Sequence, residues 1–381
     1  MKKLVFILLF LLIETPSSLL AQNTTSTGSQ QNSPVLGATK FLLTGDAEAS
    51  YVANTDENGF GDINFKPIFL WQLSHRLFFE TEVEIETGDG EPDIGLEYAN
   101  MAYTVNPYLI VHAGRFLSLF DGYFGKFKEG FLNRFPSDPV GYDDGGIASR
   151  IETGIGIEGN IPVGMAKVNY DLYVSNGPHL LAGSSDAPEE AGQLDYEAYV
   201  TNNKAKAIGG RIGILPLSDS SVELGFAFQT KNKVGDVGTP LENTGATMFG
   251  LDLNYYHLFT PLKSMFRVNG SWKTLKVDRA QYVNQDDPGT MYTFNNKSSA
   301  YYIQASLRPS QSESPLLQNL EFAFRHSSFD PPDGAVWGGR HIYKEEVAMS
   351  YWLKWNALLK IGYAAQTGEN DQFLMQLVYG F

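Results

Sequence analysis

The chain has 381 residues, of which 43% are hydrophobic and 13% aromatic, and it contains no cysteine. Its formal net charge of −15 disfavours nucleic acid as a partner, and without cysteine we expect neither disulfides nor a lipid anchor. Its length would suffice for two soluble domains, yet no linker-like segment interrupts it and turn signals recur throughout. The composition therefore favours one continuous all-β unit.

The first 21 residues have the features of a secretory signal peptide. Lys2 and Lys3 precede an apolar run of about ten residues, which is too short for a membrane-spanning helix, and Ala21 is a small residue before a cleavage site. The next residues are rich in Asn, Thr, Ser and Gln. We expect a signal peptide over 1–21, a flexible segment over 22–39 and a single domain over 40–381, with cleavage taking the net charge from −15 to −16.

About sixteen strand-like segments follow. Apolar and polar residues alternate along most of them, as where Leu224 and Phe226 alternate with Glu223 and Gly225, and no run of 18 apolar residues occurs. The predicted strands are 40–52, 60–72, 77–87, 96–105, 108–115, 150–160, 166–176, 207–216, 221–231, 247–258, 264–275, 298–307, 320–329, 344–354, 358–366 and 372–381.

Tight turns and long polar loops alternate between these strands. This alternation is typical of a transmembrane antiparallel β-barrel with short periplasmic turns and long extracellular loops, and a closed barrel is the only spanning fold left once helices are excluded. A soluble β-sandwich or propeller also has alternating strands and is the alternative fold.

The third long loop, residues 116–149, is too long to be an ordinary connection. Its aromatic residues recur at intervals of three and four, which predicts one face of a helix-like turn. We expect the loop to fold into the lumen and narrow it, although a lid lying outside the barrel is also open. The predicted constriction residues are Phe116, Phe120, Asp121, Phe124, Lys126, Lys128, Glu129, Phe131, Arg134, Asp143 and Asp144.

Alternation also predicts which charged residues face the lumen. The expected acidic wall comprises Asp46, Glu48, Glu80, Glu82, Glu84 and Glu86, and the expected basic wall comprises Arg211, Arg267, Lys273, Arg325, Lys354 and Lys360. Facing walls of opposite charge would produce a transverse field across the lumen. The alternative is that these charges pair with carboxylates and cations on neighbouring strands and only keep the interior wet.

Catalytic and metal-binding patterns are weak. The six histidines are scattered without the paired spacing of a zinc site, and no Gly-x-Ser-x-Gly elbow or phosphate-binding loop occurs. We therefore expect no enzyme activity, no metal site and no cofactor.

The signal peptide, the strand pattern, the stretch Ala113–Phe116 leading into the long loop and the terminal Phe381 together resemble outer-membrane porins related to the phosphate-selective porin family of Gram-negative bacteria. The resemblance implies a channel with an inward constriction loop. It also implies that the barrel-assembly machinery reads the terminal strand through Phe373, Met375, Leu377, Tyr379 and Phe381. Phosphate selectivity is not expected, because acids outnumber the basic residues of the loop.

We therefore expect an outer-membrane porin for passive diffusion of small hydrophilic or charged solutes, with the acidic wall favouring cations. The expected partners are outer-membrane lipid, the barrel-assembly machinery and small solutes or ions, and a homotrimer is left open. Two alternatives remain: a non-conducting barrel that acts as a protein-binding or assembly component, and an outer-membrane hydrolase.

Overall fold

The computed structural model describes residues 40–56, 58–87, 92–120, 122–127, 129–142, 146–147, 150–196, 202, 205–285, 287 and 289–381. The predicted signal peptide and flexible segment lie outside these residues, so both stay predictions.

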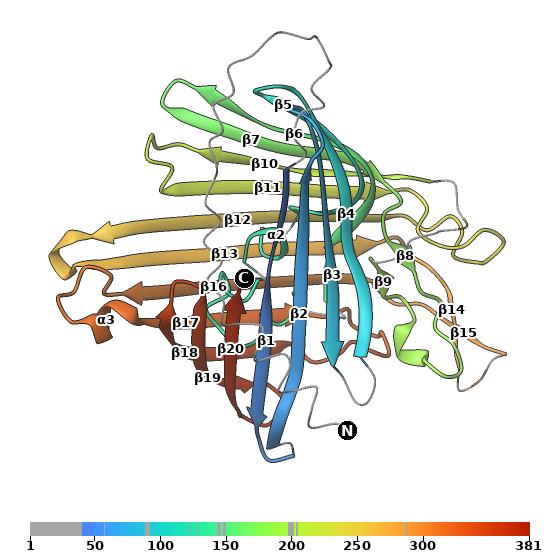
Figure 1. Ribbon diagram of the computed structural model, residues 1–381. Coiled ribbons are helices and arrows are strands. Elements are labelled where there is room, and N and C mark those ends of the chain that lie inside the picture. The colour runs from blue at the N-terminus through green and yellow to red at the C-terminus, as the bar shows by residue number, and fades with distance from the viewer. Residues whose placement is uncertain are drawn as a thin grey trace, which may run out of the picture. The chain divides into compact units, whose positions relative to one another are not determined.

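Sixteen strands form one closed antiparallel barrel (Figure 1). They are β1 (Lys40–Ala53), β2 (Asn58–Gln72), β3 (Leu77–Thr87), β4 (Pro92–Asn106), β5 (Leu109–Leu117), β6 (Ile151–Val163), β7 (Ala166–Ser175), β10 (Ala207–Leu215), β11 (Val222–Lys231), β12 (Ala246–Phe259), β13 (Ser264–Val277), β16 (Lys297–Arg308), β17 (Leu320–Asp330), β18 (Ile342–Lys354), β19 (Ala357–Gln366) and β20 (Gln372–Gly380). The predicted all-β barrel is confirmed.

The connections hold the remaining elements. They are the short strands β8 (His179–Leu180), β9 (Leu194–Asp195), β14 (Tyr282–Val283) and β15 (Met291–Tyr292), the helices α2 (Phe124–Phe127) and α3 (Pro315–Asn319), and the 3-10 turns η1 (Pro188–Glu190) and η2 (Thr260–Leu262). In the described part of the chain, no helix is both long and apolar enough to cross a lipid bilayer.

The first and last barrel strands close the ring. Each strand pairs with its neighbours along the barrel, and β1 pairs with β20 from Asp46 opposite Gly380 to Ala53 opposite Phe373. Thr44 Oγ1 donates to the Phe381 carbonyl oxygen at 2.9 Å across the same seam. No edge strand is left unpaired in this ring.

The two faces of the barrel wall have opposite character. On β11, Leu224 and Phe226 are 50% and 46% exposed, whereas the intervening Glu223 is buried. Arg325 and Lys360 are fully buried on the inner face of other strands. An apolar outer surface around a polar interior is the pattern that a barrel in lipid requires.

Connections differ in length at the two rims. The short-turn rim carries the turns 73–76, 107–108, 164–165, 216–221, 260–263, 309–319 and 355–356, and the long-loop rim carries the remaining connections. Figure 1 shows β8, β9, β14 and β15 at one side of the barrel and α3 at the other. Long polar insertions are therefore confined to one rim, as the sequence predicts.

The long connection after β5 spans residues 118–150, so the predicted boundary is shifted and Phe116 belongs to β5. Among the described residues of this connection, only Phe124–Phe127 are α-helical. Gly122, with φ +63°, precedes this turn and disfavours an earlier start of the helix. The predicted single aromatic face over the whole segment is therefore wrong.

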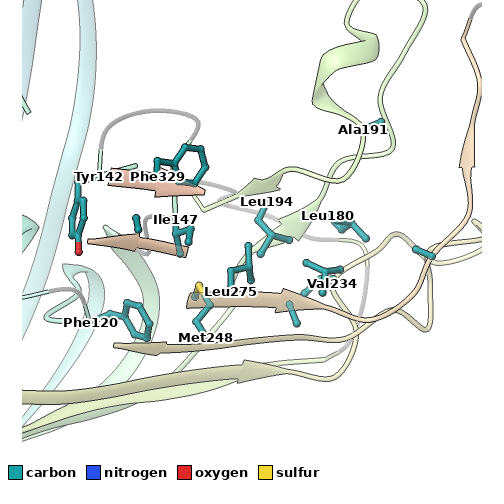
Figure 2. Close-up of a cluster of buried hydrophobic side chains, with 14 of the residues drawn as sticks. Phe120, Tyr142, Ile147, Leu180, Ala191, Leu194, Val234, Met248, Leu275 and Phe329 are labelled. Atoms are coloured by element: carbon teal, nitrogen blue, oxygen red, sulfur yellow. The ribbon is translucent and has the colours of Figure 1, made fainter. Parts of the chain in front are cut away.

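A hydrophobic cluster joins five connections of the long-loop rim. Its buried members include Phe120, Tyr123, Val140, Tyr142 and Ile147 of the 118–150 loop, Leu180, Ala191 and Leu194 after β7, Val234 and Leu241 after β11, Ala280, Tyr282 and Phe294 after β13, and Phe329 at the end of β17, with Trp337 packed against them. Figure 2 shows Leu180, Leu194 and Val234 gathered near Leu275. We call this set the loop cluster.

Candidate functional site

The first part of the 118–150 loop lies on the inner face of β11 and β12. A Cβ on Gly122 would meet the Asp252 side chain at 2.7 Å, and Lys126 Nζ donates to Glu223 Oε1 at 2.6 Å. Desolvation by burial is the largest influence on Lys126 and lowers the pKa of its ammonium group, against the opposing effect of Glu223. The loop therefore reaches from β5 to strands that are not its neighbours in the barrel.

The middle of the loop contacts β17 and β18. The Phe131 ring stacks on Trp352 with centroids 6.4 Å apart. Arg134 Nε donates to Glu321 Oε1 at 2.9 Å, and Arg267 Nη1 donates to the same oxygen at 2.8 Å. One buried carboxylate thus holds a guanidinium from the loop and another from the barrel wall.

The next turn of the loop fills a site between β17 and β18. Arg325 Nε donates to Glu346 Oε2 at 2.5 Å, its Nη2 donates to the Ser137 carbonyl oxygen at 2.7 Å, and its guanidinium lies 4.3 Å from the Phe135 ring centroid. Lys344 Nζ donates to Ser137 Oγ at 3.1 Å, and that hydroxyl also bonds to Glu346. The backbone and the hydroxyl group of Ser137 therefore supply hydrogen-bond partners to charged side chains of the barrel wall.

Most of the predicted basic wall is inward and already engaged. Arg211 is 2% exposed and donates to both oxygens of Asp252, at 2.6 and 2.7 Å. Lys273 Nζ lies 3.6 Å from the Tyr142 ring centroid, and Lys360 Nζ donates to Gln376 Oε1 at 2.7 Å. With the Arg267 and Arg325 pairs, this favours local pairing over an open basic wall.

Lys354 lies apart from the other five predicted basic residues. The register between β18 and β19 shifts after Trp352, so Lys354 pairs with Ala357 at the short-turn rim, and its side chain is exposed. Ala357 in turn pairs with Tyr379, which is 41% exposed on the outer face. A β-bulge changes the face on which later residues lie.

All six predicted acidic-wall residues lie on β1 and β3: Asp46, Glu48, Glu80, Glu82, Glu84 and Glu86. Asp46, Glu48 and Glu82 are buried and the other three are half-buried. Lys66 Nζ lies 3.2 Å from Glu84 Oε1 and is itself buried. The structure therefore brings the acidic residues together on neighbouring inner positions, with a lysine among them.

Two cavities lie along this acidic side of the lumen. The loop-side cavity, about 610 Å³, is lined by Glu48, Glu84, Glu86 and Lys66 from the wall, and by the 118–150 loop at Asn133 and Pro136–Asp138. The turn-side cavity, about 560 Å³, is lined by Glu80, Tyr98, Asn100, His112, Phe116, Leu119, Glu158 and Asp171 among others. Residues of the 118–150 loop therefore line both cavities.

Of the predicted constriction residues, Phe116 lies in β5, and the other ten are placed as follows. Phe120 and Phe124 are buried, and Lys126, Phe131 and Arg134 make the contacts given above. Glu129 is half-buried and contributes to the electrostatic environment of Lys66. Asp121, Lys128, Asp143 and Asp144 lie outside the described residues.

One polar group of the interior was not predicted. His112, Glu158 and Asp171 meet in the turn-side cavity from β5, β6 and β7. The sequence pattern that could have placed Asp171 in the lumen lies on β7, where Asn169, Asp171 and Tyr173 alternate with apolar residues.

No protein-family model matches the chain, and neither does the sequence of any curated protein. Its fold is similar to solved outer-membrane channels. Salmonella typhi OmpF, in a complex with daunomycin, matches with a TM-score of 0.58 and 12% identity, over 90% of this chain and 98% of that one. The DcaP channel of Acinetobacter baumannii matches at 0.55 and 10%, over 90% and 97% of the two chains.

The anion-selective porin from Comamonas acidovorans has a TM-score of 0.52 and 14% identity, over 90% of this chain and 100% of that one. Identities this low show a shared fold and nothing of the solute. The chain therefore has the sixteen-strand barrel fold seen in outer-membrane porins.

Proposed function

We propose that this chain is an outer-membrane porin of a Gram-negative bacterium, through which small hydrophilic solutes diffuse passively without chemistry or cofactor. The observation that carries this proposal is the pair of charged cavities along the acidic side of the lumen, one toward each rim, both lined by the 118–150 loop. A wide barrel leaves an aqueous channel unless something fills it. Here the loop narrows the channel and is its constriction.

The proposed path follows the acidic side of the lumen. Glu48, Glu84 and Glu86 line the loop-side cavity, and Glu80 lines the turn-side cavity. Between them lies Glu82, which is 4% exposed and pairs across the strands with Tyr98. The carboxylates that line the two cavities outnumber the bases that do so, which are Lys40, Lys66, Arg115, Arg150 and Lys360. We therefore propose a channel that favours cations.

Purified barrel in a planar lipid bilayer tests the proposal. We expect discrete openings of stable conductance, and under a salt gradient a reversal potential with the sign of cation preference. A barrel that inserts but carries no steady current would contradict the porin function. A steady current without cation preference would support the porin function and contradict only the proposed cation selectivity.

A non-conducting barrel that binds another protein is the second candidate. The loop cluster favours it, because apolar residues from five connections pack over the lumen on the β10–β17 side and give the long-loop rim a fixed surface. The bilayer experiment separates the two candidates, since this one predicts insertion with no current.

We further propose that the terminal strand carries the signal for the barrel-assembly machinery, through the outward-facing Phe373, Leu377, Tyr379 and Phe381. Met375 belongs to the same set. Assembly as a homotrimer would bury part of the apolar outer face, and crosslinking of the barrel in native membranes would reveal it.

A further inference from the structure

The turn-side cavity is apolar on one side and acidic on the other. Leu42, Leu70 and Phe78 line it from β1, β2 and β3, and Leu119 and Phe116 line it from the start of the 118–150 loop and the end of β5. Opposite them lie the carboxyl groups of Glu158 and Asp171, which are cross-strand partners on β6 and β7. A volume of about 560 Å³ is within the range of small-molecule sites in proteins.

The acidic side of this cavity contains buried polar atoms that make no hydrogen bond. Asp171, His112 and Asn100 are 3%, 4% and 7% exposed. Asp171 Oδ1, Asn100 Oδ1 and both ring nitrogens of His112 make no hydrogen bond, and His112 Nε2 stands 3.6 Å from Asp171 Oδ1. Buried polar atoms are usually hydrogen-bonded, so the Asp171 and Asn100 oxygens point to donors that bind there.

The charges around these atoms are mostly negative. Glu80 also lines the cavity, and its Oε1 accepts a hydrogen bond from Asn100 Nδ2 at 3.1 Å. Arg211 is the cross-strand partner of Asp171 on β10, but its guanidinium bonds to Asp252. The lining also includes Lys40, whose side chain is exposed at the short-turn rim.

We propose that the turn-side cavity is a binding subsite for small organic ammonium ions that carry an apolar body. The ammonium group donates to Asp171 Oδ1 beside Glu158, and the body packs against Leu119 and the Phe116 ring. A cation near an aromatic face gains further attraction. A bare metal ion would need several oxygen ligands, which the apolar wall lacks, and an anion would meet three carboxylates.

This inference rests on the proposed porin function only for the route by which the ion arrives. Binding is measured by isothermal titration calorimetry on the refolded full barrel in detergent, with phenethylammonium as the probe. The uncharged 2-phenylethanol, which has the same body, is the matched ligand. The variants are Asp171→Asn and, should that one not fold, Glu158→Gln. The control is Asp219→Asn, which changes a carboxyl on an exposed turn outside the cavity.

We expect phenethylammonium to bind at least about tenfold more tightly than 2-phenylethanol, and Asp171→Asn or Glu158→Gln to remove at least about tenfold of that affinity. Asp219→Asn should bind like the wild type. Equal binding of the two ligands, no binding, or an affinity that neither cavity variant changes overturns the subsite. A barrel that binds the ammonium ion but carries no current overturns the porin function and leaves the subsite standing.

Discussion

Arg134 and Glu321 are 187 residues apart in the sequence, and in the barrel interior their Nε and Oε1 atoms are 2.9 Å apart. Glu321 is 1% exposed and also accepts from Arg267 at 2.8 Å. The 118–150 loop is therefore tied to a carboxylate that the wall already holds in place. This arrangement positions the loop at a defined distance from β17.

Replacing Arg134 by Ala should increase the motion of the 118–150 loop while lowering the free energy of unfolding of the barrel only moderately. Glu321 keeps Arg267, so we expect a loss of about 1–3 kcal/mol in the free energy of unfolding, below the cost of leaving a buried charge alone. Single-channel recordings should show larger current fluctuations. Arg76→Ala, on an exposed turn, is the control; equal noise in both variants would mean that the ion pair does not position the loop.

The double variant Glu82→Gln with Glu84→Gln should weaken cation preference. Two carboxylates leave the proposed path while the side chains keep nearly the same shape, so the reversal potential under a salt gradient should move toward zero. Glu345→Gln removes a carboxylate whose side chain is 51% exposed, outside the path, and should change nothing. An unchanged potential in the double variant would rule out the acidic wall as the source of selectivity.

Lys126→Met tests whether the half-buried ammonium group contributes to the stability of the barrel. Glu223 would keep Arg211 at 2.9 Å and Asn169 at 2.9 Å, so we expect a change within about 1 kcal/mol near neutral pH. Burial lowers the pKa of Lys126 below its ordinary value of 10.5. At pH values between the pKa of Lys126 in the folded barrel and its pKa in the unfolded chain, the unfolded chain binds more protons. The free energy of unfolding of the wild type should therefore rise with pH in this range.

The measurement for Lys126 is urea unfolding of the wild type and of Lys126→Met at about pH 7 and about pH 10. The wild type should gain stability relative to the variant at the higher pH, because only the wild type carries this ammonium. A relative loss at the higher pH would show that the pair with Glu223 outweighs burial.

Phe381→Ala should affect assembly more than stability. The ring stacks on Phe65 with centroids 5.3 Å apart and is 38% exposed, so its loss should cost only about 1 kcal/mol in refolded barrel. In cells we expect much less folded barrel, measured by heat-modifiable migration in gels. Phe322→Ala, at an outer position that is 50% exposed, is the control. Equal yields of folded barrel for the two variants would show that the barrel-assembly machinery does not recognise the ring of Phe381.

The barrel follows from local sequence because alternation is a local property. Along Val222–Lys231 the alternation of apolar and polar residues indicates which face of the strand each side chain lies on. The strand begins one residue after its predicted start. The largest shift at a strand end is at Pro92, where a polar Gly-containing stretch reads as a loop but pairs with β3. Period-two patterns place strands, while Gly and Pro obscure their ends.

The interior was less predictable, because contacts there join distant residues. Nothing near Arg134 indicates that its carboxylate is Glu321, and one bulge after Trp352 removes Lys354 from the lumen. Outside the 118–150 loop, the apolar residues of the long loops lie in polar stretches without a period, so the sequence did not indicate their part in the loop cluster. Such contacts depend on the register of the whole ring.

The loop cluster also constrains how this protein can diverge. Trp337 Nε1 donates to the Ala191 carbonyl oxygen at 3.1 Å, and Asn296 Nδ2 donates to the Gly192 carbonyl oxygen at 2.7 Å, so one loop is fastened to two others. An insertion in any of the five connections must be accommodated by the rest. A change in the β1–β2 connection, which has no member in the cluster, would need no such accommodation, so the five joined loops are expected to change together.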